Sequence, residues 1–378
     1  MNNRKNLLVS IAAIVVLCCL SVQCTQQMLD LPNMESHPDV PVLYASPVGR
    51  IQGSGTRDDP VDLRTGLSHV RRDTVLELLG GIYRIPNGSI LYLGGLGSPR
   101  SIIRAASGER PIITGENDFP PYVYLQKSTR VEGIWFGGIA DSANTPFNMS
   151  NDDEIVGCVF WGYYGCIGDA SKHNVYERNL FVNCGRGTLY HPIYITGRST
   201  SWDSCTIVRR NVFVGGEGWA IHLWHGPTYV RVENNFLGNV SHCFASDGVP
   251  VIARDNVFWS HTAQPTILIL GDMTLTHNLI GKNHTYYEYR DPAALSVAAD
   301  RNSFIEPASP GGPFGTNPIR WDETGTGLRL GTGAPEIYNA ISVLEGVFRQ
   351  PAATLQTDPT PVQKWRVLLG ALDSWSAH

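Results

Sequence analysis

Charge is scarce in this sequence of 378 residues, since Asp, Glu, Lys and Arg make up only 17% of it and the formal net charge is −5. Nucleic-acid binding requires a basic face, and this balance gives no electrostatic reason to expect one. None of the eight cysteines has a CxxC or other zinc-type spacing. We therefore expect no nucleic-acid partner and no cysteine-based metal site, and we interpret the cysteines beyond the N-terminus as small buried apolar residues, with disulfides between neighbouring turns as the alternative.

A hydrophobic run long enough to cross a membrane is also missing near the N-terminus. The apolar run LLVSIAAIVVLCCL spans 14 residues and ends at Leu20, which is short for a membrane span. Arg4 and Lys5 precede it and small or polar residues follow, the pattern of an export signal. We predict a signal peptide over 1–24 and a secreted or cell-surface protein. An uncleaved anchor or a lipid on Cys24 is the alternative, and membrane contact is expected only through these.

What the sequence does contain is a repeated phrase from Val131 to Phe304. Each copy has an apolar strand and an aromatic or aliphatic anchor, and six of the eight copies have an Asn two residues before the anchor. The anchors are Phe136, Phe160, Phe181, Phe213, Phe236, Phe258, Ile280 and Phe304. Self-similarity at a period of about 22 residues is typical of a solenoid, because one unit cannot bury its apolar face without a stacked neighbour.

The repeated asparagines look like a ligand row but have a simpler interpretation. They are Asn179, Asn211, Asn234, Asn256, Asn278 and Asn302. Asn tolerates left-handed backbone and bonds neighbouring peptide groups. We therefore interpret the column as stacked turn residues with a structural role.

The segment before the repeat carries a more specific pattern. Gly55-Thr56 and Asp59-Pro60 form a turn phrase, a short helical pattern follows, and Gly80-Gly81-Ile82-Tyr83 comes after an Asp-Thr-Val strand. Together with IIRAASGERPIITG over 102–115, this order resembles the opening module of secreted right-handed parallel β-helix proteins of the pectate-lyase-like superfamily. The resemblance extends across the repeat and covers about 250 residues.

The resemblance implies an all-β fold, a single-stranded right-handed parallel β-helix of about nine to eleven turns over 51–305. A capping helix with Asp62 as its N-cap would cover the first turn. Residues 25–50 are expected to form a linker or N-terminal arm, and residues 306–378 a C-terminal cap with a short helical tail. A helix that docks onto a partner or a membrane surface is the alternative for this tail.

Two apolar helix faces are predicted in that tail. The first contains Ile337, Ile341, Leu344 and Phe348. The second covers 361–372, with Thr360 as N-cap and an apolar side formed by Trp365, Leu368, Leu369 and Leu372.

One step of the repeat is anomalous, because the turn between Phe181 and Phe213 gains about ten residues. An insertion into a solenoid turn has to bulge outward as loops on one side, where solenoids commonly bind ligands. Counting from the anchors predicts Asp169, Tyr194 and His222 in one outward-facing column. The candidate catalytic residues are Tyr194, His222, His191, Arg186 and Asp169, and the candidate substrate-binding residues are Tyr190, Trp219, Trp224, His225 and Asp247.

This mixture of aromatic, His and Arg side chains suits a polysaccharide. Sugar rings pack on Trp and Tyr, and Arg186 would bind a uronate carboxylate. A Tyr and a His can supply the acid and base of a β-elimination, whereas hydrolysis needs two carboxylates, for which Asp169, Glu217 and Asp247 are the candidates. The leading hypothesis is an exported polysaccharide lyase-like enzyme on an acidic glycan. The alternative is a non-catalytic surface or matrix protein that binds or self-assembles through the same rod.

No cofactor is identifiable from the sequence, although Ca²⁺, a cofactor of many β-helix lyases, is one that the resemblance allows. The run Asn151-Asp152-Asp153-Glu154 has the oxygen ligands that Ca²⁺ prefers. Its alternative interpretation is a solvated turn before the next strand.

Overall fold

The computed structural model describes residues 41–70, 74–95, 100–139, 147–187, 189–260, 267–281, 297–300, 303–304 and 330–376. The predicted signal peptide, residues 25–40 of the predicted linker, and Asn302 lie outside the described residues.

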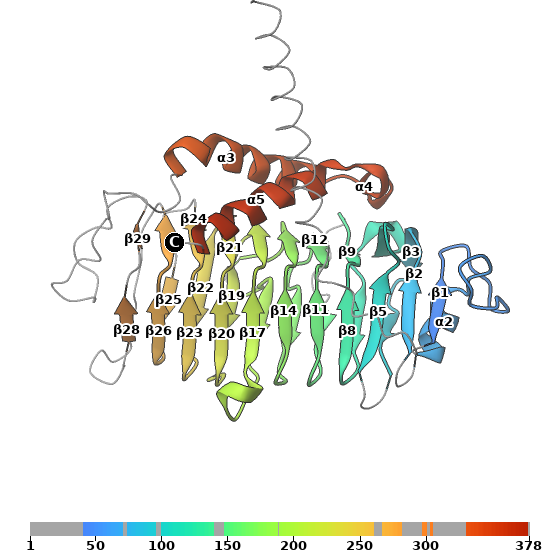
Figure 1. Cartoon of the computed structure of the whole chain (residues 1–378), viewed down its shortest axis with the longest axis horizontal. Coiled ribbons are helices and arrows are strands. Elements are labelled where there is room, and N and C mark those ends of the chain that lie inside the picture. The colour runs from blue at the N-terminus through green and yellow to red at the C-terminus, as the bar shows by residue number, and fades with distance from the viewer. Residues whose placement is uncertain are drawn as a thin grey trace, which may run out of the picture. The chain divides into compact units, whose positions relative to one another are not determined.

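Three parallel sheets make up the repeat (Figure 1). The first sheet has 11 strands: β1 (Val42–Ala45), β2 (Val75–Leu78), β5 (Ser101–Ala105), β8 (Thr129–Glu132), β11 (Glu154–Val156), β14 (Val175–Glu177), β17 (Thr206–Arg209), β20 (Val230–Glu233), β23 (Val251–Arg254), β26 (Met273–Thr276) and β28 (Val297–Asp300).

The second sheet has 10 strands: β3 (Gly81–Ile85), β6 (Pro111–Gly115), β9 (Trp135–Gly137), β12 (Val159–Trp161), β15 (Leu180–Val182), β18 (Val212–Val214), β21 (Phe236–Val240), β24 (Val257–Ser260), β27 (Leu279–Gly281) and β29 (Ser303–Phe304). The third sheet has 8 strands: β4 (Ile90–Leu93), β7 (Tyr122–Leu125), β10 (Phe147–Asn148), β13 (Ile167–Asp169), β16 (Ile193–Ile195), β19 (Trp219–Leu223), β22 (His242–Ser246) and β25 (Ile267–Ile269).

Neighbours within each sheet come from successive turns of the chain, so the predicted all-β parallel solenoid is confirmed. Eight turns contribute a strand to all three sheets. The helix α2 (Leu63–His69) begins where expected, because the Asp62 carboxylate accepts the backbone N–H of Thr65 at 3.0 Å. That this helix closes the first turn, and that the coil is right-handed, stay predictions.

Aromatic rings stack inside the coil at the predicted anchors. Phe136, Phe160, Phe181 and Phe213 are in register, with neighbouring ring centroids 5.5, 5.0 and 4.7 Å apart. The prediction was wrong by one residue in the next turn, because Leu237 lies opposite Phe213 there and Phe236 faces outward. The repeat phrase in that turn contains two adjacent asparagines, and the second, Asn235, occupies the column position.

The asparagine column is internal, and its third member is Asn235 rather than Asn234. From Asn179 to Asn256, the backbone N–H and the Nδ2 of each column Asn both donate to the Oδ1 of the Asn in the next turn. Asn234 instead has the left-handed backbone, with a φ of 55°. The structural interpretation of the column is therefore confirmed, although the left-handed residue precedes the asparagine.

The C-terminal helices α3 (Leu330–Val347), α4 (Ala352–Thr357) and α5 (Thr360–Ser376) lie along the outer face of the second sheet (Figure 1). Their apolar sides pack on outward strand residues such as Trp161 and Phe236. Arg110 fastens the α4 region by donating to the carbonyls of Leu355 and Asp358 at 2.5 and 2.6 Å. The helices thus cover a lateral face, and closure of the last turn by residues 306–378 stays a prediction.

Both predicted helix faces are buried in this cluster, with Leu369 partly buried. The prediction was wrong for Thr360, which is the first residue of α5, since the Asp358 carboxylate accepts its backbone N–H at 2.8 Å. No helix in the described part of the chain is both long and apolar enough to cross a membrane.

The described cysteines follow the simpler interpretation. Five are described, and all five are free and buried. Cys158 illustrates their position inside the coil, since its backbone N–H donates to the Oδ1 of Asn179 at 2.9 Å. They act as small apolar residues of the interior.

Candidate functional site

One column of side chains runs along the outer surface of the third sheet. Strand register brings its members opposite one another in successive turns: Tyr92, Tyr124, Asn148, Gly168, Tyr194, His222, Ala245 and Leu268. Residues on either side of each member point into the core, as alternation along a strand requires. We call this set the outer column.

Asp169 is not a member of the outer column, so its predicted place was wrong. Gly168 lies opposite Tyr194, and Asp169 lies opposite the inward Ile195. Register aligns Trp161 with Val214 and Ile167 with Ile221, so the chain reaches the third sheet one residue sooner after β12 than after β18, which shifts the count from the anchor. The buried Asp169 carboxylate accepts hydrogen bonds from Ser171, Asn174 and Tyr176, so it holds a turn together.

The anomalous long turn splits into two loops, 183–192 and 196–205, on either side of β16. The prediction of loops on one side only was therefore wrong. Glycine allows the first loop to approach the next turn: a Cβ on Gly218, whose φ is 84°, would lie 2.4 Å from the carbonyl oxygen of Tyr190. This close approach places His191 beside β19.

His191, Tyr194 and His222 form one ring cluster, as predicted. The His191 and His222 ring centroids are 4.1 Å apart, and Tyr194 lies 5.5 and 5.2 Å from them. The His191 Nδ1 accepts the backbone N–H of Trp219 at 3.2 Å. The His222 Nδ1 is buried and has no hydrogen-bond partner in the described part of the chain.

The electrostatics of the cluster favour neutral imidazoles. Burial, with a smaller effect of His191 and His225, lowers the pKa of His222 to about 3. Burial likewise lowers the pKa of His191 to about 4, against the opposing effect of its bond to Trp219. Burial also raises the pKa of Tyr194, assisted by the negative charge of Asp247. At neutral pH the cluster therefore contains proton acceptors beside a phenol that keeps its proton.

Tryptophans and a further histidine widen this surface. Trp224 and Trp219 lie 4.9 and 6.4 Å from the His222 ring, which agrees with the prediction that they belong to one face. His242, which the sequence reasoning missed, stacks on Trp219 with ring centroids 4.4 Å apart. His242 could have been predicted from its position opposite Trp219 on the next strand.

The turn after β19 completes the cluster. His225 is exposed and lies 6.4 Å from the Tyr194 ring. The Asp247 carboxylate accepts the backbone N–H groups of His225 and Gly226 at 3.1 and 2.9 Å, so it shapes this turn. Arg198, another missed residue, donates to the His225 carbonyl at 3.0 Å and brings a cation to this edge of the cluster.

Arg186 and Tyr190 lie on the opposite side of the first loop. The Arg186 guanidinium packs over the Tyr164 ring at 4.7 Å, and Tyr190 lies 6.0 Å from the same ring. Arg186 lines a cavity under the end of α3 together with Glu217. The structure therefore does not bring Arg186 into the ring cluster of His191, Tyr194 and His222.

The acidic run at 151–154 uses its oxygens within the protein. Asp152 accepts from His173 and Lys127 lies 3.9 Å from it, Glu154 bonds Arg130, and Asp153 accepts two backbone N–H groups. No group of three His, Cys, Asp or Glu residues in the described ranges could hold a metal ion. The run thus does not fit the predicted Ca²⁺ ligands, and it is the turn before β11.

The three sheets form a parallel β-solenoid, and a similar curated protein confirms the predicted resemblance to pectate-lyase-like β-helix proteins. The chain is similar to Pectate lyase L of Thermoclostridium stercorarium, with 33% identity over 216 residues, which is 54% of this chain and 15% of that protein. The chain therefore spans a small part of this relative. No family model matches the sequence.

Two solved structures match the chain with TM-scores below 0.5. A mannuronic acid specific polysaccharide family 6 lyase from human gut microbiota matches with 14% identity and a TM-score of 0.46, covering 72% of this chain and 78% of that one. Pectate lyase Pel9A matches with 14% identity and a TM-score of 0.40, covering 72% of each chain.

Proposed function

We propose that this chain is an exported polysaccharide lyase-like protein that acts on an acidic glycan along the outer column. The main support for the proposal is the buried Nδ1 of His222, which lies beside Tyr194 and has no hydrogen-bond partner among the described residues. A buried nitrogen without a partner costs free energy unless a ligand supplies one. The proposal includes export by 1–24 and the right-handed coil that parallel crossover connections almost always form.

The proposed step is a β-elimination on a uronide. His222 takes the proton from the carbon next to the carboxyl group, and the C–H electron pair becomes the new C=C bond. The bond from the neighbouring carbon to the glycosidic oxygen breaks, and that oxygen takes the hydroxyl proton of Tyr194. A uronate carboxylate beside His222 would raise the pKa of the imidazole and make it a better base.

A cation is needed to bind the substrate carboxylate and stabilise the charge that develops on it. Arg198 takes the role first predicted for Arg186, since it lies at the His225 edge of the cluster. Trp219 and Trp224 offer ring faces for sugars next to the reacting groups. The relative named as a pectate lyase supports an acidic glycan as the substrate class.

The outer column gives the glycan a place to extend. Tyr92 and Tyr124 are 53% and 41% exposed, and their ring centroids are 5.8 Å apart. Between these rings and Tyr194, the outer column contains only Asn148 and Gly168, which have a small side chain or none. A polysaccharide lying across the strands would meet this platform several turns before the reacting groups.

The carboxylates favour a lyase over a hydrolase. Hydrolysis needs a carboxylate pair that faces one bond. Asp169 is internal, Glu217 lines the cavity under α3, and Asp247 holds backbone N–H groups of the β19 turn. These three carboxylates therefore do not form a pair that faces one glycosidic bond.

The test is incubation with pectins, alginates and glycosaminoglycans, with and without added Ca²⁺, while absorbance from unsaturated product ends is recorded. We expect product from at least one uronate polymer, and at least a hundredfold loss of rate in Tyr194→Phe and in His222→Gln. Tyr44→Phe on β1 and His69→Gln on α2 are the matched controls and should keep full activity. Product with unchanged rates in both site variants would refute the residue roles.

Absence of product across the whole panel would reject the lyase activity. Binding without product would then support the second function, a non-catalytic glycan-binding rod. The buried His222 nitrogen favours this alternative as well as catalysis, because it is satisfied by any hydroxyl donor. Affinity electrophoresis in the same polymers separates the two outcomes.

A further inference from the structure

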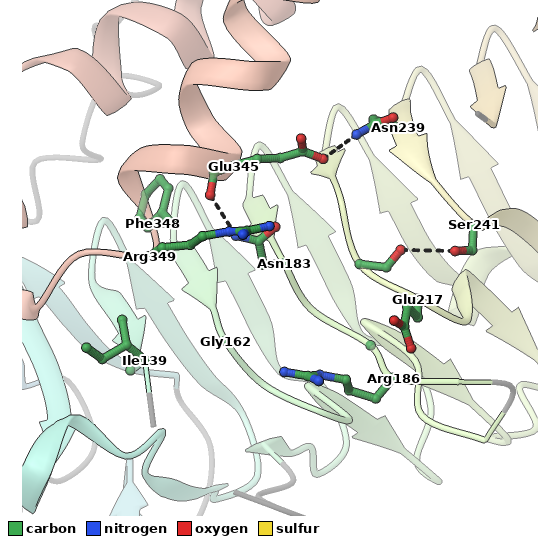
Figure 2. Close-up of a pocket in the computed structure, with 13 residues that line it drawn as sticks. Ile139, Gly162, Asn183, Arg186, Glu217, Asn239, Ser241, Glu345, Phe348 and Arg349 are labelled. Atoms are coloured by element: carbon green, nitrogen blue, oxygen red, sulfur yellow. Dashed lines mark hydrogen bonds between the residues drawn. The ribbon is translucent and has the colours of Figure 1, made fainter. Parts of the chain in front are cut away.

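A second concave region lies on another side of the coil, between the end of α3 and the corners that follow the second sheet (Figure 2). Its volume is about 670 Å³. Four charged side chains line it, namely Arg186, Glu217, Glu345 and Arg349. Its polar lining also includes Asn183, Asn239 and Ser241.

The acidic side chains of this cavity are already engaged by the protein. Glu217 accepts the backbone N–H of Gly187 at 3.1 Å. Glu345 accepts a hydrogen bond from the Asn239 amide, and its carbonyl accepts from Asn183 at 3.0 Å. Their charges are therefore fixed at the walls, and they can still accept hydroxyl donors with their remaining lone pairs.

Arg349 differs from these carboxylates. Arg349, directly after α3, is exposed and makes no ion pair with any residue that the structure describes. Arg186 packs on Tyr164, and Figure 2 shows its side chain directed toward the cavity from the side opposite α3. A planar guanidinium is the group that best binds a carboxylate with two hydrogen bonds.

Glycine keeps the floor of the cavity open. Gly162 and Gly216 have φ values of 72° and 94°, and a Cβ on either would lie 1.9 Å from a carbonyl oxygen of the preceding turn. Side chains are therefore excluded where these turns meet the cavity. The floor of the cavity is therefore backbone, and charged side chains form its walls.

We propose that this cavity is a second binding site, which takes a carboxylate-bearing sugar unit. Arg186 and Arg349 bind the carboxylate, and Glu217, Asn183 and Asn239 bind the hydroxyls. The site shares only the class of ligand with the proposed function and does not require the Tyr194 and His222 cluster to be catalytic. It would hold an acidic glycan on a face away from the outer column.

Two short segments connect this cavity with the ring cluster. Arg186 and His191 both lie in the first loop, 183–192, and Glu217 is two residues before Trp219. The Trp219 backbone N–H that His191 accepts therefore lies directly beyond the cavity wall. Binding at the cavity can be measured separately from any reaction at His222, because the two sites have different lining residues.

The experiment uses isothermal titration calorimetry with the full chain carrying Tyr194→Phe and His222→Gln, which removes the reacting groups of the outer column, so the cavity variants identify where a probe binds. The probes are tetragalacturonate, a tetramer of mannuronate and neutral galactotetraose. We expect an acidic tetramer to bind, the neutral one to bind at least tenfold more weakly, and Arg349→Gln or Arg186→Gln to reduce acidic affinity about tenfold. Arg366→Gln on the exposed side of α5 removes the same charge outside the cavity and should change nothing.

Three results would overturn the site: no binding of either acidic tetramer, equal binding of the neutral tetramer, or unchanged affinity in both cavity variants. A melting temperature equal to that of the Arg366→Gln control excludes misfolding as the cause of a loss. If polymer cleavage fails in the unmodified protein while this binding persists, the lyase proposal falls and the cavity proposal stands.

Discussion

Two columns of side chains run along the same coil, one inside and one outside. In the internal column, Asn211 donates to the Tyr176 carbonyl and to Asn235, while its Oδ1 accepts twice from Asn179. In the outer column, the His222 Nδ1 has no partner among the described residues. Both columns repeat once per turn of the coil. The polar atoms of the internal column have hydrogen-bond partners within the protein, whereas the His222 Nδ1 has none among the described residues.

The difference distinguishes polar groups that stabilise the solenoid from polar groups that are available to bind a ligand. A polar group that is buried and fully bonded in every turn stabilises the stack, and changing it should affect folding first. A polar group left unsatisfied at a surface costs stability without contributing to the stack. Substitutions in the internal column should therefore lower the stability of the fold, whereas substitutions in the outer column should mainly affect activity or ligand binding.

The largest effect on stability is expected for Asn211→Ala. The change removes the partners of Asn179, Tyr176 and Asn235 at a fully buried position, and we expect a loss of about 3 kcal/mol in the free energy of unfolding. Urea denaturation followed by circular dichroism measures it.

The matched control is Asn87→Ala in an exposed turn, which should cost less than about 0.5 kcal/mol. If both variants unfold at the same urea concentration, the internal column does not stabilise the stack in the way its hydrogen bonds indicate.

A smaller effect is expected from pH at His222. Its pKa is about 3 in the folded chain, below the unfolded value of about 6.5, so the unfolded state binds the proton first as pH falls. Stability from this group is fully present above pH 6.5 and decreases between there and pH 3. At pH 5 the loss is roughly 2 kcal/mol in the wild type, and His222→Gln should not show it.

The measurement compares unfolding free energies at pH 5 and 7.5 for wild type and variant. Asp153 contributes a slope of opposite sign, because burial raises its pKa to about 7, and His191 contributes a slope of the same sign as His222; both groups are present in both proteins, so the difference between the two proteins reports His222. His69→Gln should keep the wild-type slope. A variant with the same pH dependence as the wild type would mean that His222 is not held neutral by burial.

The repeat made the fold predictable, because a period and an apolar pattern are local properties of the sequence. The errors were shifts of one residue. Asn234 and Asn235 are adjacent, and only the hydrogen bonds between turns show which one enters the column. Asp169 was displaced by a corner shorter by one residue, a length that the anchors do not record.

The site was predictable in part for the same reason. Tyr194, His222 and His191 meet because they belong to successive or inserted segments of one face. Arg186 leaves that face because the inserted segment turns back at Gly187, and no periodic signal describes such a turn. The cavity under α3 depends on contacts between residues more than a hundred positions apart, such as Asn239 with Glu345.

The smallest effect is expected on the first sheet, where outward charges pair across strands. Arg209 donates to the Glu177 carboxylate at 2.7 Å, and 44% of the Arg209 side chain is exposed. Exposed pairs contribute about 0 to 1 kcal/mol and are screened by salt. Arg209→Gln should therefore cost at most about 1 kcal/mol at low salt and less at 0.5 M NaCl, with Glu177→Gln giving a similar loss. Unchanged glycan binding in both would keep the first sheet outside the functional surface, whereas a loss of binding as large as that of His222→Gln would extend the surface to it.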